Sequence, residues 1–158
     1  MRVLGIDPGT AITGWAVVEN GRNVKNSVTC VDYGVIRTPA GLDMPLRLKD
    51  LYEDLVGLIE KYRPTHAAIE ELYFFKNQKT VIKVGQARGV VIIAAANSGL
   101  KVFDYTPLQV KQAVTGYGRA EKKQIQEMVK LIANLKEIPK PDDAADAIAV
   151  GICHLNSV

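Results

Sequence analysis

The sequence predicts a single α/β domain in which a mixed five-stranded sheet is covered by helices. The chain has 158 residues, which is the size of one domain. Its apolar residues follow a strand-like pattern three times near the start and then alternate between helical and strand-like periodicity. The composition, with 47% hydrophobic and 23% charged residues, is that of a chain able to bury a sizeable core. We therefore expect residues 1–158 to form one domain.

Three extended segments open the chain without a helix between them. The first is an apolar run closed by Pro8 and Gly9, and the third ends just before Pro39 and Gly41. Consecutive strands joined by short turns pair in an antiparallel manner. We expect strands at 3–7, 14–18 and 28–37, arranged as a meander.

Helices and two further strands follow. Apolar residues recur at helical spacing over 46–62 until Pro64, and Pro139 and Pro141 interrupt the last helical region. The expected elements are a helix at 46–62, a strand at 66–70, a helix at 80–97, a strand at 100–105, a helical turn at 106–114, a helix around 125–132 and a terminal helix at 144–155. The segment 90–96 is apolar on every side, more than one core-facing side requires, so we expect a second apolar surface to cover it.

Several classes of protein are disfavoured. No window approaches the roughly 20 apolar residues of a membrane span, and Met1 leads directly into a strand rather than a secretory signal. Cys30 and Cys153 lie far apart, and neither they nor His66 and His154 have the spacing of zinc ligands. Nucleophile-elbow, P-loop and dinucleotide-binding motifs are missing from the sequence. We expect a cytoplasmic protein that does not contact a membrane, and no basic tail after the last helix.

Basic residues are concentrated in one part of the chain. Residues 76–123 contain nine basic and two acidic residues, for a net charge of +7, whereas the remainder has a net charge of −4. A basic region of this kind favours a polyanionic partner. A lysine-rich solvated surface would give the same pattern and remains the alternative at this point.

Carboxylates occupy three positions that can converge. Asp7 ends the first strand, Glu70 ends the fourth, and Asp143 and Asp146 project from one face of the last helix. Taken singly, Asp7 also fits a turn before Pro and Gly, and Glu70 fits an exposed strand end. Together they would offer the hard oxygen ligands that Mg²⁺ prefers. Two such ions would favour hydrolysis of a phosphodiester by water without a protein nucleophile.

Two neighbouring acidic residues are expected to lie outside this group. Glu71 follows Glu70 directly, and adjacent strand residues point to opposite faces, so only one of the two can face Asp7. Asp142 follows Pro141 at the start of the last helix and is expected to be its N-cap.

Five short motifs occur in order along the chain: Gly5-Ile6-Asp7-Pro8-Gly9, Ala68-Ile69-Glu70, Gly85-Gln86-Ala87-Arg88-Gly89, Gln109-Val110-Lys111-Gln112 and Asp143-Ala144-Ala145-Asp146. In this combination they resemble the RuvC family of Holliday-junction resolvases, and the resemblance spans essentially the whole chain. It implies an RNase H-like fold and a homodimeric crossover junction endodeoxyribonuclease. Such an enzyme resolves four-way DNA junctions by paired symmetric nicks and depends on Mg²⁺.

The resemblance also implies roles for individual residues. The acidic tetrad would be Asp7, Glu70, Asp143 and Asp146, binding two Mg²⁺ ions, for which Mn²⁺ can substitute. Lys122 would hold the scissile phosphate or orient the attacking water. The family's stacking aromatic falls on Tyr73, where phenylalanine is expected, so Phe74 is the alternative; such stacking contributes roughly 1–3 kcal/mol per base. The expected DNA-binding residues are Tyr73, Phe74, Lys76, Lys83, Arg88, Lys111, Arg119, Lys122 and Lys123.

The resemblance further implies two protein partners. Gly85 and Gly89 would let the helix at 80–97 approach its copy closely in a homodimer, and the RuvA–RuvB branch-migration complex would act with it. The main alternative function is an RNase H-like nuclease of the YqgF type that cuts RNA or simple duplex. A junction-binding module without activity and a phosphotransferase of the actin-like group are weaker alternatives, because the carboxylate set is intact and 158 residues leave no room for paired domains.

Overall fold

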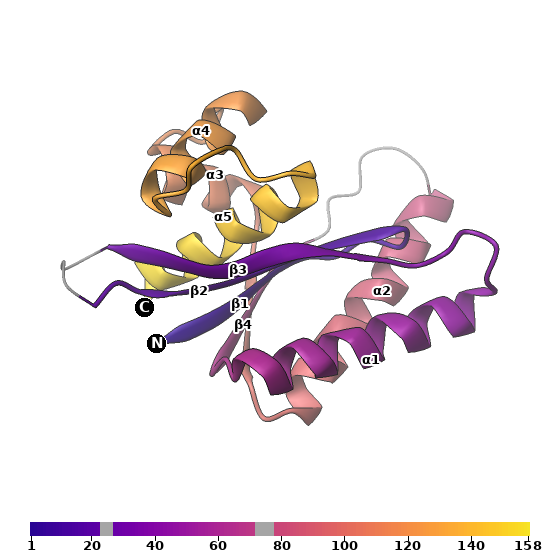
Figure 1. Cartoon of the computed structure of the whole chain (residues 1–158). Helices are drawn as coiled ribbons and strands as arrows, with labels where there is room; N and C mark the ends of the chain where they lie inside the picture. The colour runs from indigo at the N-terminus through magenta and orange to yellow at the C-terminus, as the bar shows by residue number, and fades with distance from the viewer. Residues whose placement is uncertain (23–26, 72–77) are drawn as a thin grey trace.

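The computed structural model describes residues 1–22, 27–71 and 78–158. These residues form five strands and five helices (Figure 1). In chain order the elements are β1 (Arg2–Asp7), β2 (Ile12–Asn20), β3 (Val28–Arg37), α1 (Met44–Tyr62), β4 (His66–Glu70), α2 (Gln78–Asn97), β5 (Lys101–Tyr105), α3 (Pro107–Thr115), α4 (Lys122–Ile132) and α5 (Asp142–Ser157). None of the helices described is both long and apolar enough to span a membrane.

The five strands form one mixed sheet in the order β3-β2-β1-β4-β5. The first three strands pair in an antiparallel meander, and β4 and β5 run parallel to β1. Both the meander and the mixed five-stranded sheet predicted from the sequence are confirmed. Because β1 and β4 are parallel neighbours, with Ile6 opposite Ile69, their last residues Asp7 and Glu70 lie at the same edge of the sheet.

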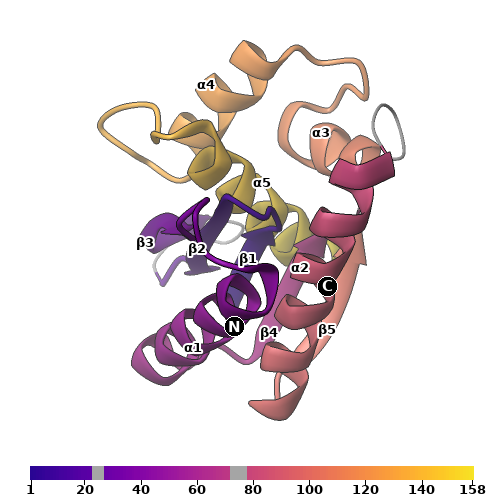
Figure 2. The same ribbon diagram turned by 90° about the vertical axis from the view of Figure 1, so that its right-hand side faces the viewer.

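Helices cover both faces of the sheet. Helices α1 and α2 pack on one face, and α3, α4 and α5 lie on the other (Figures 1 and 2). Alternate residues of a strand point to opposite faces, so β1 contributes Leu4 and Ile6 to the first core and Val3 to the second. A sheet buried on both faces explains why its strands read as continuous apolar runs in the sequence.

Helix α5 lies directly on the backbone of β1 and β2. A Cβ atom added at Gly5 would come 2.2 Å from the carbonyl oxygen of Ala147, and one added at Gly14 would come 1.9 Å from the carbonyl oxygen of Asp143. Only glycine permits this approach. Because Gly14 pairs with Asp7 across the sheet, the contact places the first turn of α5 beside the end of β1.

The helices that carry the predicted site lysines begin at defined positions. Helix α3 starts with a capping box, in which the hydroxyl of Thr106 accepts from the backbone N–H of Gln109 at 3.1 Å and the Gln109 side chain accepts from the Thr106 N–H at 2.8 Å. Helix α4 begins at Lys122, after Glu121. These starts fix the direction in which Lys111 and Lys122 leave the backbone.

Candidate active site

Asp7 and Glu70 form a pair of half-buried carboxyl groups at the carboxyl ends of two neighbouring strands. They share a side-chain hydrogen bond. Burial, followed by the charge of Glu70, raises the pKa of Asp7 to about 9. Burial also raises the pKa of Glu70, while the hydrogen bond from Asp7 and the charge of Lys111 act in the opposite direction. At neutral pH the pair therefore retains a proton.

The first two turns of α5 bring two more carboxylates to this pair. Asp143 lies over Gly14, and Asp146 lies one turn further along the helix. Burial raises the pKa of Asp146 to about 6, and the charge of Lys122 lowers it. Both aspartates also raise the pKa of Asp7 through their charge. The structure thus places the four carboxylates that the sequence singled out at the same end of the sheet.

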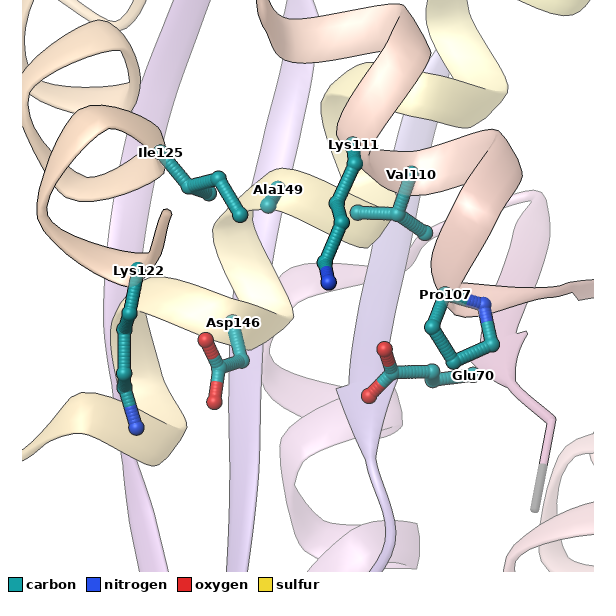
Figure 3. Close-up of a pocket in the computed structure, with 8 residues that line it drawn as sticks. All are labelled: Glu70, Pro107, Val110, Lys111, Lys122, Ile125, Asp146 and Ala149. Carbon is teal, nitrogen blue, oxygen red and sulfur yellow. The ribbon is translucent and has the colours of Figure 1, made fainter. Parts of the chain in front are cut away.

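A cavity of about 240 Å³ opens beside these carboxylates (Figure 3). Its charged lining comes from Glu70 and Asp146 together with Lys111 and Lys122, and four less polar residues complete the wall. In full the lining consists of Glu70, Pro107, Val110, Lys111, Lys122, Ile125, Asp146 and Ala149. In Figure 3 the Lys111 side chain points toward Glu70, and Lys122 and Asp146 lie side by side. The cavity therefore combines metal-ligand chemistry with cations able to bind a phosphate.

Lys122 is held by an acidic residue outside the predicted tetrad. Its ammonium lies 2.9 Å from a carboxylate oxygen of Asp142, and the other oxygen accepts from Gln126 at 3.1 Å. The hydrogen bond with Asp142 is the main cause of the raised pKa of Lys122. The expectation that Asp142 is the N-cap of the last helix is wrong. Pro141 occupies that position, and the Asp142 side chain bonds to α4.

The donor set fits a hard divalent cation. Within the described residues, no three aspartate, glutamate, histidine or cysteine side chains are arranged closely enough to hold one ion. The four carboxylates nevertheless offer only oxygen donors, and burial and mutual repulsion raise the pKa values of Asp7 and Asp146. A divalent cation offsets both effects. The oxygen donors present therefore fit a hard divalent cation.

The other predicted DNA-binding residues that the structure describes do not line this cavity. Arg88 of α2 forms an ion pair with Asp104 and so ties α2 to the edge strand β5. Lys83, Arg119 and Lys123 are exposed. Tyr73, Phe74 and Lys76 fall outside the described residues.

Two residues near the site were missed by the sequence analysis. Gly14 carries the close contact with Asp143, and a glycine inside a strand is a recognisable sign of a close backbone approach. Thr13 is buried, and its hydroxyl donates to the carbonyl oxygen of Gly9 at 2.8 Å and accepts from the Gly9 N–H at 3.3 Å. This pair of hydrogen bonds fixes the turn that follows Asp7.

Comparison with known proteins agrees with this geometry. The model of the family described as "Crossover junction endodeoxyribonuclease RuvC" matches residues 3–154. The RuvC of Caldanaerobacter subterraneus subsp. tengcongensis is 59% identical over 157 residues, which cover 99% of this chain and 93% of that protein. The RuvC of Halothermothrix orenii is 55% identical, with the same coverage of both proteins.

Solved structures of RuvC proteins also resemble this chain. Thermus thermophilus RuvC superposes with a TM-score of 0.90 at 34% identity, and the match covers 99% of this chain and 94% of that one. The same protein in complex with a Holliday junction substrate superposes with a TM-score of 0.93 at the same identity and coverage. The RNase H-like fold implied by the five motifs is confirmed, and the chain belongs to the RuvC family of crossover junction endodeoxyribonucleases.

Proposed function

We propose that this protein is a Holliday-junction resolvase that hydrolyses one phosphodiester bond in each of two opposed strands of a four-way DNA junction. Family membership supports this function, as does the junction complex of the Thermus thermophilus relative. The observation that carries the proposal is the gathering of Glu70 and Asp146 with two lysines in one cavity, next to Asp7, which interacts with Glu70. None of the matches reported above supports the YqgF-type alternative.

The proposed cofactor is Mg²⁺, with two ions per active site and Mn²⁺ able to substitute. Asp7, Glu70, Asp143 and Asp146 would hold them, because these are the oxygen donors that cluster at the sheet edge. Bound there, the ions supply an activated water and stabilise the leaving oxygen of a phosphodiester. Asp7 and Glu70 must lose their shared proton for both carboxylates to act as ligands.

The lysines of the cavity would bind the phosphate. Lys111 lies beside Glu70 and Lys122 beside Asp146, so a phosphate bound between them meets a cation on two sides. Val110, Ile125 and Ala149 form an apolar wall that keeps bulk water from part of this space. Exclusion of water strengthens the attraction between the ammonium groups and the phosphate.

DNA outside the cavity would meet the other basic residues. Lys83, Arg119 and Lys123 are exposed cations, and Arg88 keeps its charge while paired with Asp104. Together with Lys76 they would contact backbone phosphates, which contribute affinity without sequence preference. Stacking at the junction centre is assigned to Tyr73 or Phe74.

A homodimer through α2 is part of the proposal. The outward side of α2 carries Ile82 and Ile93, which are 62% and 48% exposed, on the same helical stripe as Gly89. A Cβ atom added at Gly89 would meet nothing within 4 Å, so a second copy of the helix can approach there. Two-fold symmetry would give two active sites for two symmetry-related strands. A monomeric mass in light scattering at micromolar concentration would contradict this.

Three further assignments complete the proposal. Residues 1–158 would act as one domain, the protein would work in the cytoplasm, and the RuvA–RuvB branch-migration complex would be its protein partner. The substrate class is tested by offering a four-way junction, a linear duplex of the same sequence and an RNA–DNA hybrid in Mg²⁺. Nicks confined to the junction are expected. Cleavage of the hybrid or the duplex at a similar rate would favour the YqgF-type activity instead.

A further inference from the structure

Asp142 connects the two helices that border the active-site cavity. Asp142 is the first residue of α5, and both of its carboxylate oxygens are engaged by α4. One oxygen lies 2.9 Å from the Lys122 ammonium, and the other accepts from the Gln126 amide at 3.1 Å. Lys122 and Gln126 are one helical turn apart, so they lie on the same side of α4. This arrangement fixes the carboxylate and, through it, the ammonium of Lys122.

The ion pair contributes little to the stability of the fold. The side chains of Lys122 and Asp142 are 59% and 58% exposed, and ion pairs between exposed side chains add little to the free energy of unfolding. The ion pair therefore serves to position the ammonium group of Lys122, and it adds little to the contact between α4 and α5.

A second carboxylate competes for the same ammonium. Asp146 lines the cavity next to Lys122, and the charge of Lys122 already lowers the pKa of Asp146 (Figure 3). Asp146 is more buried than Asp142, and a charge pair is screened less where water is partly excluded. Without Asp142, the ammonium of Lys122 would therefore pair with Asp146.

We propose that Asp142 is a positioning residue that keeps the Lys122 ammonium away from Asp146, so that Asp146 stays available to a divalent cation. The inference rests on the proposed function, in which Asp146 is a metal ligand. Lys122 has three N–H donors, and Asp142 engages one of them. Asp142 is its one acceptor within residues 1–22, 27–71 and 78–158, so the other donors can meet a DNA phosphate while Asp146 binds the cation.

A double-mutant cycle on Mn²⁺ binding tests this inference without DNA. The probe is Mn²⁺ alone, and electron paramagnetic resonance measures the unbound ion. Asp142→Ala removes a negative charge near the site in any background, but it releases an ammonium only when Lys122 is present. We expect Asp142→Ala to weaken Mn²⁺ binding roughly three- to tenfold more in the wild-type background than in a Lys122→Ala background. An equal loss in both backgrounds would overturn the inference.

Three control variants sharpen the result. Gln126→Ala removes the second partner of Asp142 but keeps the Lys122 contact, so Mn²⁺ binding should stay close to that of the wild type. Asp142→Asn keeps the shape and one acceptor oxygen but loses the charge and the second acceptor, so its affinity should lie between those of wild type and Asp142→Ala. Asp146→Asn should weaken Mn²⁺ binding strongly. If Asp146→Asn binds Mn²⁺ as well as the wild type, the proposed metal site itself is wrong, which is a different result from failure of the Asp142 cycle.

Discussion

The carboxyl groups of Asp7 and Glu70 share a hydrogen bond although they stand at the ends of two separate strands, β1 and β4. Two carboxyl groups can form such a bond only when one of them carries a proton. Burial is the main reason that the proton is retained, since it raises the pKa of both groups. A cation that binds both carboxylates must therefore displace this proton.

Cation binding is consequently expected to release protons. At pH 7, below the pKa of about 9 for Asp7, the binding of Mg²⁺ should release about one proton. The apparent affinity should rise with pH until the pair is ionised without the metal. Isothermal titration calorimetry in two buffers of different ionisation enthalpy measures the number released. Asp7→Asn removes this acid and should release fewer protons, whereas no release from the wild type at pH 7 would contradict the assignment.

The contact between Gly14 and Asp143 gives a second prediction. In Gly14→Ala the new methyl group would lie 1.9 Å from the carbonyl oxygen of Asp143, so the first turn of α5 must move. We expect a loss of about 1–3 kcal/mol in the free energy of unfolding and slower nicking, because Asp143 moves with the turn. Urea denaturation and a junction-cleavage assay measure the two effects.

Gly57→Ala in α1 is the matched control. A Cβ atom at Gly57 meets nothing within 4 Å, and alanine is favoured over glycine inside a helix by roughly 0.5–1 kcal/mol. This variant should be slightly more stable and fully active. If Gly14→Ala behaved like Gly57→Ala, the close approach of α5 to the sheet would not determine the site geometry.

Lys122 should affect the rate of nicking more than the binding of the junction. One ammonium is a small part of the basic surface, but Lys122 is one of the two lysines that line the cavity described here. For Lys122→Ala we expect a decrease of roughly a hundredfold in the single-turnover rate, as for loss of one group that stabilises developing charge. Junction affinity in a gel-shift titration should change much less, and equal losses in rate and affinity would refute this role.

A histidine outside the cavity should make stability depend on pH. His154 is fully buried, its Nδ1 lies 2.7 Å from the hydroxyl of Tyr105, and burial followed by the charge of His66 lowers its pKa to about 4. The unfolded chain binds a proton near pH 6.5, so stability is complete above that pH and decreases as the pH falls toward 4. The decrease in the free energy of unfolding that is attributable to His154 is on the order of 2–3 kcal/mol.

His154→Gln tests this dependence, since glutamine stays neutral and can still accept from Tyr105. Urea denaturation between pH 7 and pH 4 should show a shallower decrease in stability for the variant than for the wild type. The same slope for both proteins would assign the acid sensitivity to other groups.

Much of the fold could be predicted because the sequence pattern is local. The strand ending at Asp7 and the strand ending at Glu70 are short apolar runs between turn residues, and both lie where they were expected. Their convergence follows from parallel pairing, which brings the ends of neighbouring strands to the same edge. The spacing of Asp143 and Asp146 fixes their common helical face without knowledge of the rest of the chain.

The remaining features depend on contacts between distant segments. Asp142 follows a proline and precedes a helix, which is the local pattern of an N-cap, but its side chain binds Lys122 and Gln126 of a separate helix. No local pattern indicates that partner. Gly14 indicates that another segment approaches the strand closely, but the sequence does not indicate that this segment is the first turn of α5. The hydrogen bond between the two strand-end carboxyl groups likewise depends on how deeply the assembled helices bury them.

The central claim is that the carboxylates at the carboxyl ends of β1 and β4, together with those of α5, form a metal-dependent nuclease site. The most direct test measures the nicking of a mobile four-way junction by wild type and by Asp7→Asn, in Mg²⁺ and in EDTA, with junction binding followed in parallel. We predict paired nicks in opposed strands only for the wild type in Mg²⁺, with junction binding retained by the variant. Nicking by Asp7→Asn at the wild-type rate, or by the wild type in EDTA, would contradict the account.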